Sequence, residues 1–251
     1  MAAHLLKNMV GKVYKTNGGT DCTIIEYTNS KDIKVQFNDE YGCVIKANLS
    51  SLKAGCVRSP YDKTVAGVGF IGVGKYKPTD GKKATTAYEH WRSMLLRCYC
   101  DKTKQNNPTY KDCFVCEEWL NFQVFAEWYY NQKFKDCGYQ LDKDILVEGN
   151  KHYSPETCCL VPRCINTTFN SRAAARGKYL QGVSPYNNTG KFRATVKVKG
   201  NPKTLGVYST EEEAYEAYRI GKEAQVKILA LEWKGRIDNR VFDALMVWTL
   251  D

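Results

Sequence analysis

The sequence predicts an α+β protein made of three small parts, and three observations support this. Short β-branched and aromatic runs fill residues 11–57, apolar residues recur at helical spacing over residues 86–98, and residues 190–199 alternate between apolar and mostly basic side chains. A chain of 251 residues suits two or three small domains better than one large core. Strands and helices that occupy separate stretches are typical of the α+β class.

The first part, residues 1–60, is predicted to be a small β-barrel or sheet. Ile33, Val35 and Phe37 alternate with polar residues, which is the period of a half-buried strand. Turn residues such as Asn17 and Gly18 separate the strand-like runs. The pattern resembles Tudor-like and Src-homology-like modules, so this part is expected to bind nucleic acid, to bind a protein partner through residues 11–57, or only to pack.

Residues 61–84 are rich in Gly, Lys and Pro, and we expect them to be a connector. Their glycine run at 67–74 superficially resembles a phosphate-binding loop, but no Lys-Ser/Thr pair follows at the required spacing. Two helices are predicted after it, the first capped by Thr86 and the second near residues 120–133. Their expected core residues are Tyr88, Trp91, Met94, Leu95 and Cys98 in the first helix and Phe122, Phe125, Ala126 and Tyr129 in the second.

The distribution of charge points to a polyanionic partner. The formal net charge is +10, and residues 157–210 contain no Asp or Glu but many Lys and Arg. Clustered positive charge is typical of proteins that bind DNA or RNA, although a solvated basic face is the alternative interpretation. No apolar run is long enough for a transmembrane helix, so we expect no membrane partner and a cytoplasmic protein, whose eleven cysteines would be thiols or metal ligands.

The last part, residues 179–251, follows a basic linker at 171–178 and is predicted to be a three-stranded sheet with helices. Phe192, Ala194, Val196 and Val198 are expected on one face of a strand, because side chains alternate across it. Thr210 and Glu213 have capping-box spacing at the start of a long helix, and Asp238 is a plausible cap for a last helix near residues 239–248.

Several spaced motifs in this part resemble the APETALA2/ethylene-response-factor DNA-binding domain. They are Gly182-Val183, the run at 190–194 and the run at 205–218. The resemblance implies a three-stranded sheet on one helix, with the sheet in the major groove of double-stranded DNA. The residues it places against DNA are Tyr186, Lys191, Arg193, Lys197 and Lys199, with Lys203 nearby. Arg193 is the candidate for reading a guanine edge, and the lysines would mostly hold phosphates.

The segment 139–170 resembles the HNH (ββα-metal) homing-type endonucleases of phages. The motifs that carry this resemblance are the run at 139–145, the Gly149-Asn150 loop, the run at 153–162 and Ile165-Asn166. The resemblance implies that Asp142 and Asn166 hold one Mg²⁺ or Mn²⁺ that assists phosphodiester hydrolysis, and Asn170 could match the last polar position of the family's helix. It also implies the cytoplasm of an infected bacterial cell as the location.

Lys143 stands where this family has its catalytic histidine. A lysine that carries a proton is a poor general base, so Asp144 or His152 would have to take that role if the centre cuts DNA. We therefore expect either a phage-type HNH-family endonuclease, which could be of homing type, or a non-catalytic DNA-binding or regulatory protein that keeps a degenerate HNH fold. A phage interaction protein that inhibits a host nucleic-acid enzyme is the third hypothesis.

Cysteine spacing allows one further hypothesis. Cys98, Cys113, Cys116 and Cys158 could assemble a structural zinc site, although cysteines among aromatic residues are more often part of the core. The central domain that would contain these cysteines and the HNH-like segment is predicted to span residues 85–170.

Overall fold

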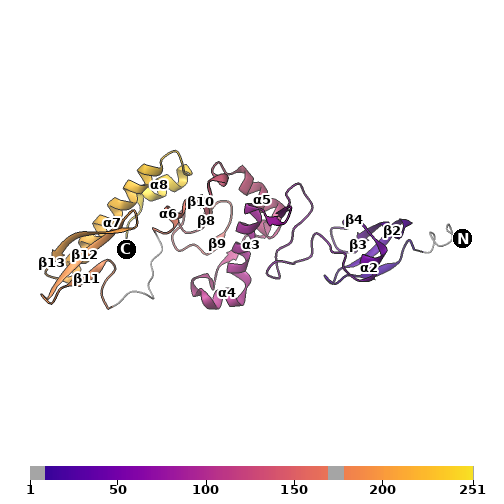
Figure 1. The fold of residues 1–251 in the computed structure, drawn as a ribbon, viewed down its shortest axis with the longest axis horizontal. Coiled ribbons are helices and arrows are strands. Elements are labelled where there is room, and N and C mark those ends of the chain that lie inside the picture. Colours follow the sequence, from indigo (N-terminus) through magenta and orange to yellow (C-terminus); the bar gives the residue numbers. More distant parts are fainter. Residues whose placement is uncertain (1–8, 169–177, 251) are drawn as a thin grey trace. The chain divides into compact units, whose positions relative to one another are not determined.

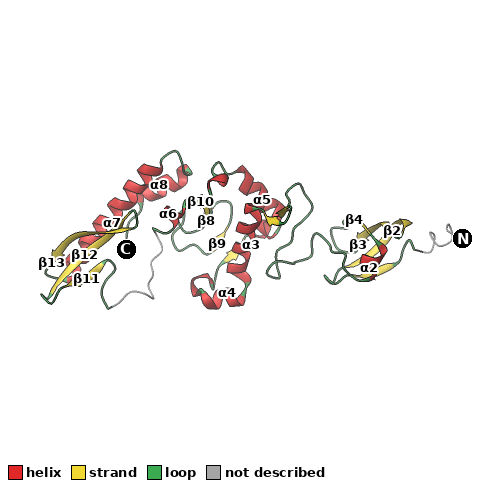
Figure 2. Ribbon diagram, viewed as in Figure 1, coloured by secondary structure: helices red, strands yellow, loops and turns green. Residues whose placement is uncertain are grey.

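The computed structural model describes residues 9–168 and 178–250 (Figures 1 and 2). These residues form a mixed α+β structure with several small sheets, as predicted. The chain divides into two compact units, Met1–Tyr130 and Asn131–Asp251, and each is described by itself. The boundary between the units falls inside the predicted central domain 85–170.

The first unit begins with a four-stranded antiparallel sheet in which neighbours in sequence are neighbours in space. Alternation along its third strand buries Ile33, Val35 and Phe37 beneath the sheet, where Ile24 and Leu52 join them. Of the two predicted forms, the sheet is confirmed and the barrel is wrong, because the short strands β1 (Val13–Lys15) and β4 (Val44–Ala47) are the two edges of an open sheet. The elements of this region are β1 (Val13–Lys15), β2 (Asp21–Asn29), β3 (Asp32–Phe37), β4 (Val44–Ala47) and α2 (Leu49–Lys53).

The helices of the first unit confirm the predicted periodicity. In α3 (Thr86–Tyr99) the side chains of Trp91, Met94, Leu95 and Cys98 are buried, whereas Tyr88 is only partly buried. In α5 (Phe122–Asn131) all four predicted core residues are buried. The cap of α3 is Thr85 rather than Thr86, because the Thr85 hydroxyl accepts from the Tyr88 N–H. Between the helices lie α4 (Asp101–Asn106), η1 (Pro108–Tyr110), β7 (Phe114–Val115) and η2 (Glu117–Leu120).

The glycine-rich stretch that we expected to be a connector packs against these helices. Phe70 N–H donates to the Leu120 carbonyl, and the Phe70 carbonyl accepts from Phe122 N–H at 2.9 Å. A Cβ on Gly69 would lie 2.3 Å from Leu95 Cδ1, so only glycine lets the backbone come this close. The stretch ends in a hairpin of β5 (Thr79–Asp80) and β6 (Lys83–Ala84).

Near its start, the second unit contains two paired strands and a short helix, within the segment that resembles the ββα-metal nucleases. Strand β8 (Gln140–Asp142) follows η3 (Lys135–Cys137) and pairs antiparallel with β10 (Cys159–Val161), after which comes the short helix α6 (Arg163–Asn166). The loop between the two strands contains β9 (His152–Tyr153). Strand, return strand and helix therefore follow one another in the order expected for a ββα element.

The rest of the second unit is the predicted three-stranded sheet with its helix. The sheet has the order β11-β12-β13, and α7 begins with the predicted capping box of Thr210 and Glu213. The first half of α7 covers one face of the sheet, where Ala214 and Tyr218 pack on Ala194. Asp238 caps the last helix, as predicted. The elements are β11 (Val183–Tyr186), β12 (Lys191–Val198), β13 (Asn201–Tyr208), α7 (Glu211–Trp233) and α8 (Asn239–Val247).

Candidate functional site

One face of the three-stranded sheet is covered by α7, and the other carries exposed basic side chains. Phe192, Ala194 and Val196 of β12 point toward α7, while Lys191, Arg193 and Lys197 are on the opposite side. Residues that pair across an antiparallel sheet share a face. The pairing partners therefore complete the basic side, which we call the outer face: Ser184, Tyr186, Lys191, Arg193, Thr195, Lys197, Pro202, Thr204 and Val207.

Two of the predicted DNA-contacting lysines lie off the outer face. The register between β12 and β13 shifts after Ala194, so Lys203 pairs with the inward-facing Val196. Lys199 has a positive φ of 50° in the turn between the strands, and its Nζ lies 3.1 Å from Glu232 Oε1 of α7. The bulge and the turn therefore place both lysines toward the helix side of the sheet, away from Lys191, Arg193 and Lys197.

Close approach of the helix keeps this sheet in shape. A Cβ on Gly182 would lie 2.1 Å from the Tyr218 ring, and one on Gly221 would lie 2.6 Å from Leu205 Cδ1. Gly182 also has a φ of +75°, which disfavours other residues. Small residues at these positions let α7 lie directly on the strands, and the outer face is thereby held by a packed layer behind it.

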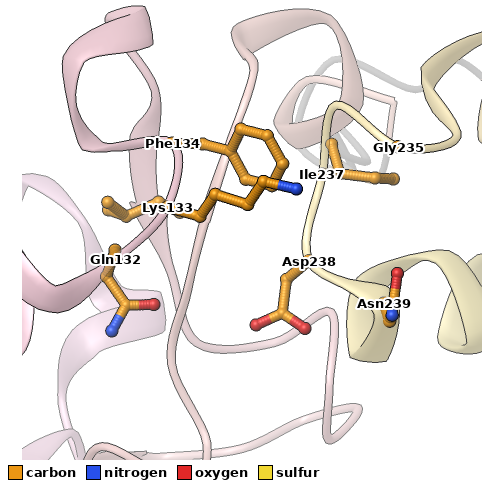
Figure 3. A pocket seen from close by; sticks show the side chains of 8 residues that line it. Gln132, Lys133, Phe134, Gly235, Ile237, Asp238 and Asn239 are labelled. Carbon is orange, nitrogen blue, oxygen red and sulfur yellow. The ribbon is translucent and has the colours of Figure 1, made fainter.

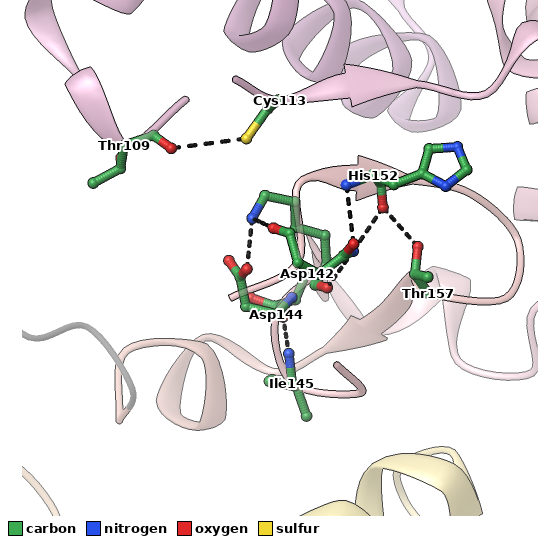
Figure 4. Close-up of polar contacts among 9 residues, drawn as sticks. Thr109, Cys113, Asp142, Asp144, Ile145, His152 and Thr157 are labelled. Atoms are coloured by element: carbon green, nitrogen blue, oxygen red, sulfur yellow. Dashed lines mark hydrogen bonds and ion pairs between the residues drawn. The ribbon is translucent and has the colours of Figure 1, made fainter. Parts of the chain in front are cut away.

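In the ββα element, the carboxylate of Asp142 organises the turn that follows β8. Its Oδ1 accepts from the backbone N–H groups of Asp144 and Ile145, at 2.8 and 2.9 Å (Figure 4). Burial raises the pKa of Asp142, and these two hydrogen bonds oppose the rise. The Asp142 carboxylate is thus a partly desolvated charge that a bound cation would stabilise.

Lys143, at the position where the HNH resemblance implies a histidine, is buried and forms an ion pair. Only 5% of the residue is exposed, and its Nζ lies 2.5 Å from Asp144 Oδ1 and also donates to the Asn150 carbonyl. The ring of Tyr153 lies beneath the ammonium, 5.9 Å away. With its Nζ bonded to both Asp144 and the Asn150 carbonyl, this side chain holds the loop together.

Asn166 lies on the same side of β8 as Asp142. Its Nδ2 donates to Gln140 Oε1 at 2.9 Å, and residues two apart on a strand share a face. Asp142 Oδ2 and Asn166 Oδ1 make no hydrogen bond to any residue in the described ranges 9–168 and 178–250. A carboxylate oxygen and an amide oxygen fit the oxygen preference of Mg²⁺, which retains several waters in protein sites. Asn170 lies outside the described residues.

His152 is held through its backbone. Its N–H donates to Asn150 Oδ1, while its carbonyl accepts from Asn150 Nδ2 and, at 2.7 Å, from Thr157 Oγ1. Figure 4 shows the imidazole directed away from Asp142 and Asp144. The side chain of Asn150 was not predicted to matter, although the Gly149-Asn150 turn signal marks its position. It joins the two ends of the loop, since Nδ2 also donates to the Lys143 carbonyl.

The predicted zinc cysteines are scattered over different elements. Cys113 precedes β7 and donates to the Thr109 carbonyl at 3.8 Å (Figure 4). Cys98 is buried in α3, Cys116 precedes η2, and Cys158 precedes β10. Among the residues that the structure describes, no three or more Asp, Glu, His or Cys side chains form a group that could hold a metal ion. The zinc hypothesis therefore gains no support from these residues.

The ββα element and the C-terminal helices meet within the second unit. Tyr139 donates to the Arg236 carbonyl at 2.8 Å, and Lys222 of α7, which no sequence pattern indicated, donates to the Thr168 carbonyl at 2.8 Å. Burial, and then the charge of Lys197, lowers the pKa of Lys222. Where the ββα element meets the C-terminal helices there is a cavity of about 240 Å³, which is smaller than pockets that bind drug-sized molecules (Figure 3). Phe134, Leu160, Ile237 and Asp238 are among its lining residues.

Compared with protein-family models, with curated proteins and with solved structures, the chain matches none of them. Within residues 9–168 and 178–250, no helix combines the length and the apolar character needed to span a bilayer. We therefore infer a function from the residues themselves and from the resemblances given above.

Proposed function

We propose that this protein binds double-stranded DNA through the outer face of its C-terminal sheet. The observation that carries the proposal is that Lys191, Arg193 and Lys197 share one face and make no ion pair with any described residue. Like charges on one face repel each other, and the repulsion lowers the stability of the free sheet. A polyanion placed over the face reverses the sign of this interaction.

The neighbours of the three cations suit a nucleic-acid surface. Arg193 lies between Ser184 and Val207, and Lys191 lies beside Tyr186. Hydroxyl groups donate to phosphates, and an exposed apolar group can contact a thymine methyl. Because a guanidinium donates to two acceptors at once, Arg193 is the residue we assign to a guanine edge, whereas the lysines act as point charges on phosphates.

The test replaces Lys191, Arg193 and Lys197 by Gln in the full chain. We expect the slope of log K against log salt to decrease by roughly 0.9 for each phosphate that the variant no longer neutralises, because fewer counterions are released. The matched control replaces Lys12, Lys31 and Lys46, three exposed lysines in or beside the N-terminal sheet, by Gln. If both triple variants bind DNA equally well in a mobility-shift titration, the outer face is excluded as the DNA-binding surface.

A second candidate function is metal-dependent cleavage of the bound DNA. It is favoured by the Asn166–Gln140 hydrogen bond, which brings the amide of Asn166 to the face of β8 that carries Asp142. When bound there, Mg²⁺ or Mn²⁺ would stabilise charge on the phosphate and the leaving oxygen. Asp142 and Asn166 would hold the ion, and the outer face would hold the duplex.

Asp142→Asn tests this second candidate with two readouts. Cleavage should disappear in a plasmid-nicking assay, while DNA affinity stays unchanged. Stability should rise at neutral pH by about 0.5–2 kcal/mol, since the amide still accepts the two backbone hydrogen bonds without a desolvated charge. The folded pKa of Asp142 is raised, so its contribution to stability is present at low pH and is lost as pH rises through that pKa. The Asp142→Asn variant should therefore not show this decrease in stability as pH rises.

The control for cleavage is the parent protein with and without a chelator, together with Lys143→His. If neither the parent nor Lys143→His nicks DNA with Mg²⁺ or Mn²⁺, the nuclease is excluded. A DNA-binding regulator, or an inhibitor of a nucleic-acid enzyme, would then be the remaining hypothesis. The stability readout separates this result from a variant that has simply unfolded.

A further inference from the structure

A second basic surface lies in the first unit, on the hairpin formed by β5 and β6. Between Lys63 and Glu89 the sequence has four lysines and one acidic residue, Asp80. Lys77, Lys82 and Lys83 are exposed, and none of them makes an ion pair with a residue in the described part of the chain. We call residues 77–84 the basic hairpin.

The basic hairpin has a narrow tip. Asp80 pairs with Lys83 across the strands, so Gly81 and Lys82 alone form the turn. Gly81 has a φ of +56°, the left-handed conformation that such two-residue turns favour. The turn therefore presents Lys82 at the end of a thin projection, with Lys83 next to it.

Side chains of the helical core fix the base of this hairpin. Gln123 of α5 accepts from the Tyr76 N–H at 3.0 Å and donates back to the Tyr76 carbonyl at 2.9 Å. On the other side, Thr85 N–H donates to the Pro78 carbonyl at 3.0 Å, and Thr85 also caps α3. Both ends of the hairpin are thus tied to helices, and its lysines are carried on a fixed backbone.

Ion pairs neutralise two lysines of the same unit, whereas the hairpin brings three lysines together within seven residues. Lys34 lies 2.6 Å from Glu26, and Lys75, just before the hairpin, lies 3.9 Å from Glu127. Lys12, Lys31 and Lys46 are also unpaired among the described residues, but they lie on separate turns and strands. Lys77, Lys82 and Lys83 lie together on one hairpin. Unpaired cations on a rigid projection are the arrangement that suits binding of an external anion.

We propose that the basic hairpin is a second contact with the DNA backbone, so that each unit holds the duplex. This inference extends the proposed function of the C-terminal sheet but rests on different residues. Ammonium groups bind phosphates as point charges and carry no sequence information. Two weak sites on one chain reinforce each other, because binding at one raises the effective concentration at the other.

The experiment measures binding of random-sequence duplex DNA by the full chain over a range of salt concentrations. The hairpin variant replaces Lys77, Lys82 and Lys83 by Gln, and the control is the Lys12, Lys31 and Lys46 variant defined above. Removing three phosphate contacts should reduce the log–log salt slope by roughly 2.7. Between about 50 and 200 mM salt, the affinity of the parent should therefore fall roughly 40-fold more than that of the hairpin variant.

The outcomes separate this proposal from the previous one. A hairpin variant with the same slope as the control overturns the second contact, whatever the outer-face variant does. If the outer-face variant binds like the parent and the hairpin variant binds more weakly, the sheet is excluded as a DNA contact and the hairpin is retained as one. A hairpin variant that loses affinity for single-stranded RNA and keeps its affinity for duplex DNA also overturns the proposal, because the hairpin would then serve RNA.

Discussion

The two antiparallel sheets of this chain have similar designs but use their outer sides differently. The N-terminal sheet buries the large residues Ile24, Ile33 and Phe37 and pairs Lys34 with Glu26 on its exposed side. In the C-terminal sheet the fully buried strand residue is Ala194, and the cations of the outer face are unpaired among the described residues. The first sheet neutralises Lys34 within the sheet, although Lys46 lies opposite it without an ion pair among the described residues. The second retains an electrostatic cost that only an external anion removes, which is why we assign binding to it.

Replacing one aromatic ring of each sheet by Ala should give the largest difference between the two sheets in the free energy of unfolding. Phe37→Ala should cost about 3–5 kcal/mol, because the ring is 1% exposed. Phe192→Ala should cost less, since that ring is only partly buried against Tyr179 and the α7 layer. Hydrogen exchange of peptides from β3 and β12 measures each sheet separately. Equal losses would mean that both sheets depend on their cores to the same degree.

A smaller effect is expected from single substitutions on the outer face. Arg193→Gln should lower discrimination between base pairs by about 1–3 kcal/mol, because a bidentate hydrogen bond to guanine is removed. Lys197→Gln should weaken binding equally for all sequences, since it contacts phosphate. Selection from a randomised duplex pool measures the first effect, and salt titration measures the second. An unchanged preference in Arg193→Gln would move sequence recognition to another residue.

The helices that follow the two sheets each begin with a capping residue, and removing either cap should change the free energy of unfolding by a similar amount. Asn48 caps α2 by accepting from Ser51 N–H, and Thr210 caps α7 by accepting from Glu213 N–H. Either residue changed to Ala should cost about 1 kcal/mol. Only Thr210→Ala should also weaken DNA binding, because α7 supports the outer face. Denaturant unfolding and a mobility shift on both variants test this, and a DNA effect from Asn48→Ala would contradict it.

The smallest expected difference between the two sheets is the effect of salt on the stability change caused by a single lysine substitution. Lys191→Gln should stabilise the C-terminal sheet by at most about 0.5 kcal/mol at low salt, and the gain should vanish at high salt as the repulsion is screened. Lys34→Gln should act in the opposite direction, because Glu26 raises the pKa of Lys34 and so favours its charged form. That contribution is present below the ordinary lysine pKa and is lost as pH rises through the raised value. Hydrogen exchange at two salt concentrations checks both signs.

Local patterns were enough to predict much of the fold. The alternation of β12, the capping box at Thr210 and the helical spacing around Trp91 depend on neighbours in sequence, and all three agree with the structure. The positions of Lys199 and Lys203 could not be predicted, because they depend on a bulge and a turn that shift the register. The burial of Lys143 depends on a carbonyl seven residues away in a folded loop.

The glycine-rich stretch before α3 has a practical consequence for anyone who divides the chain. Composition alone suggests cutting at residue 84 to isolate the helices. Gly69 lies directly against Trp91 and Leu95, however, and the Phe70 backbone pairs with the chain around Asn121. A fragment starting at residue 85 would lose this cover and expose a large apolar surface, so we expect it to aggregate. A fragment starting at residue 58 would retain the cover and should stay dispersed.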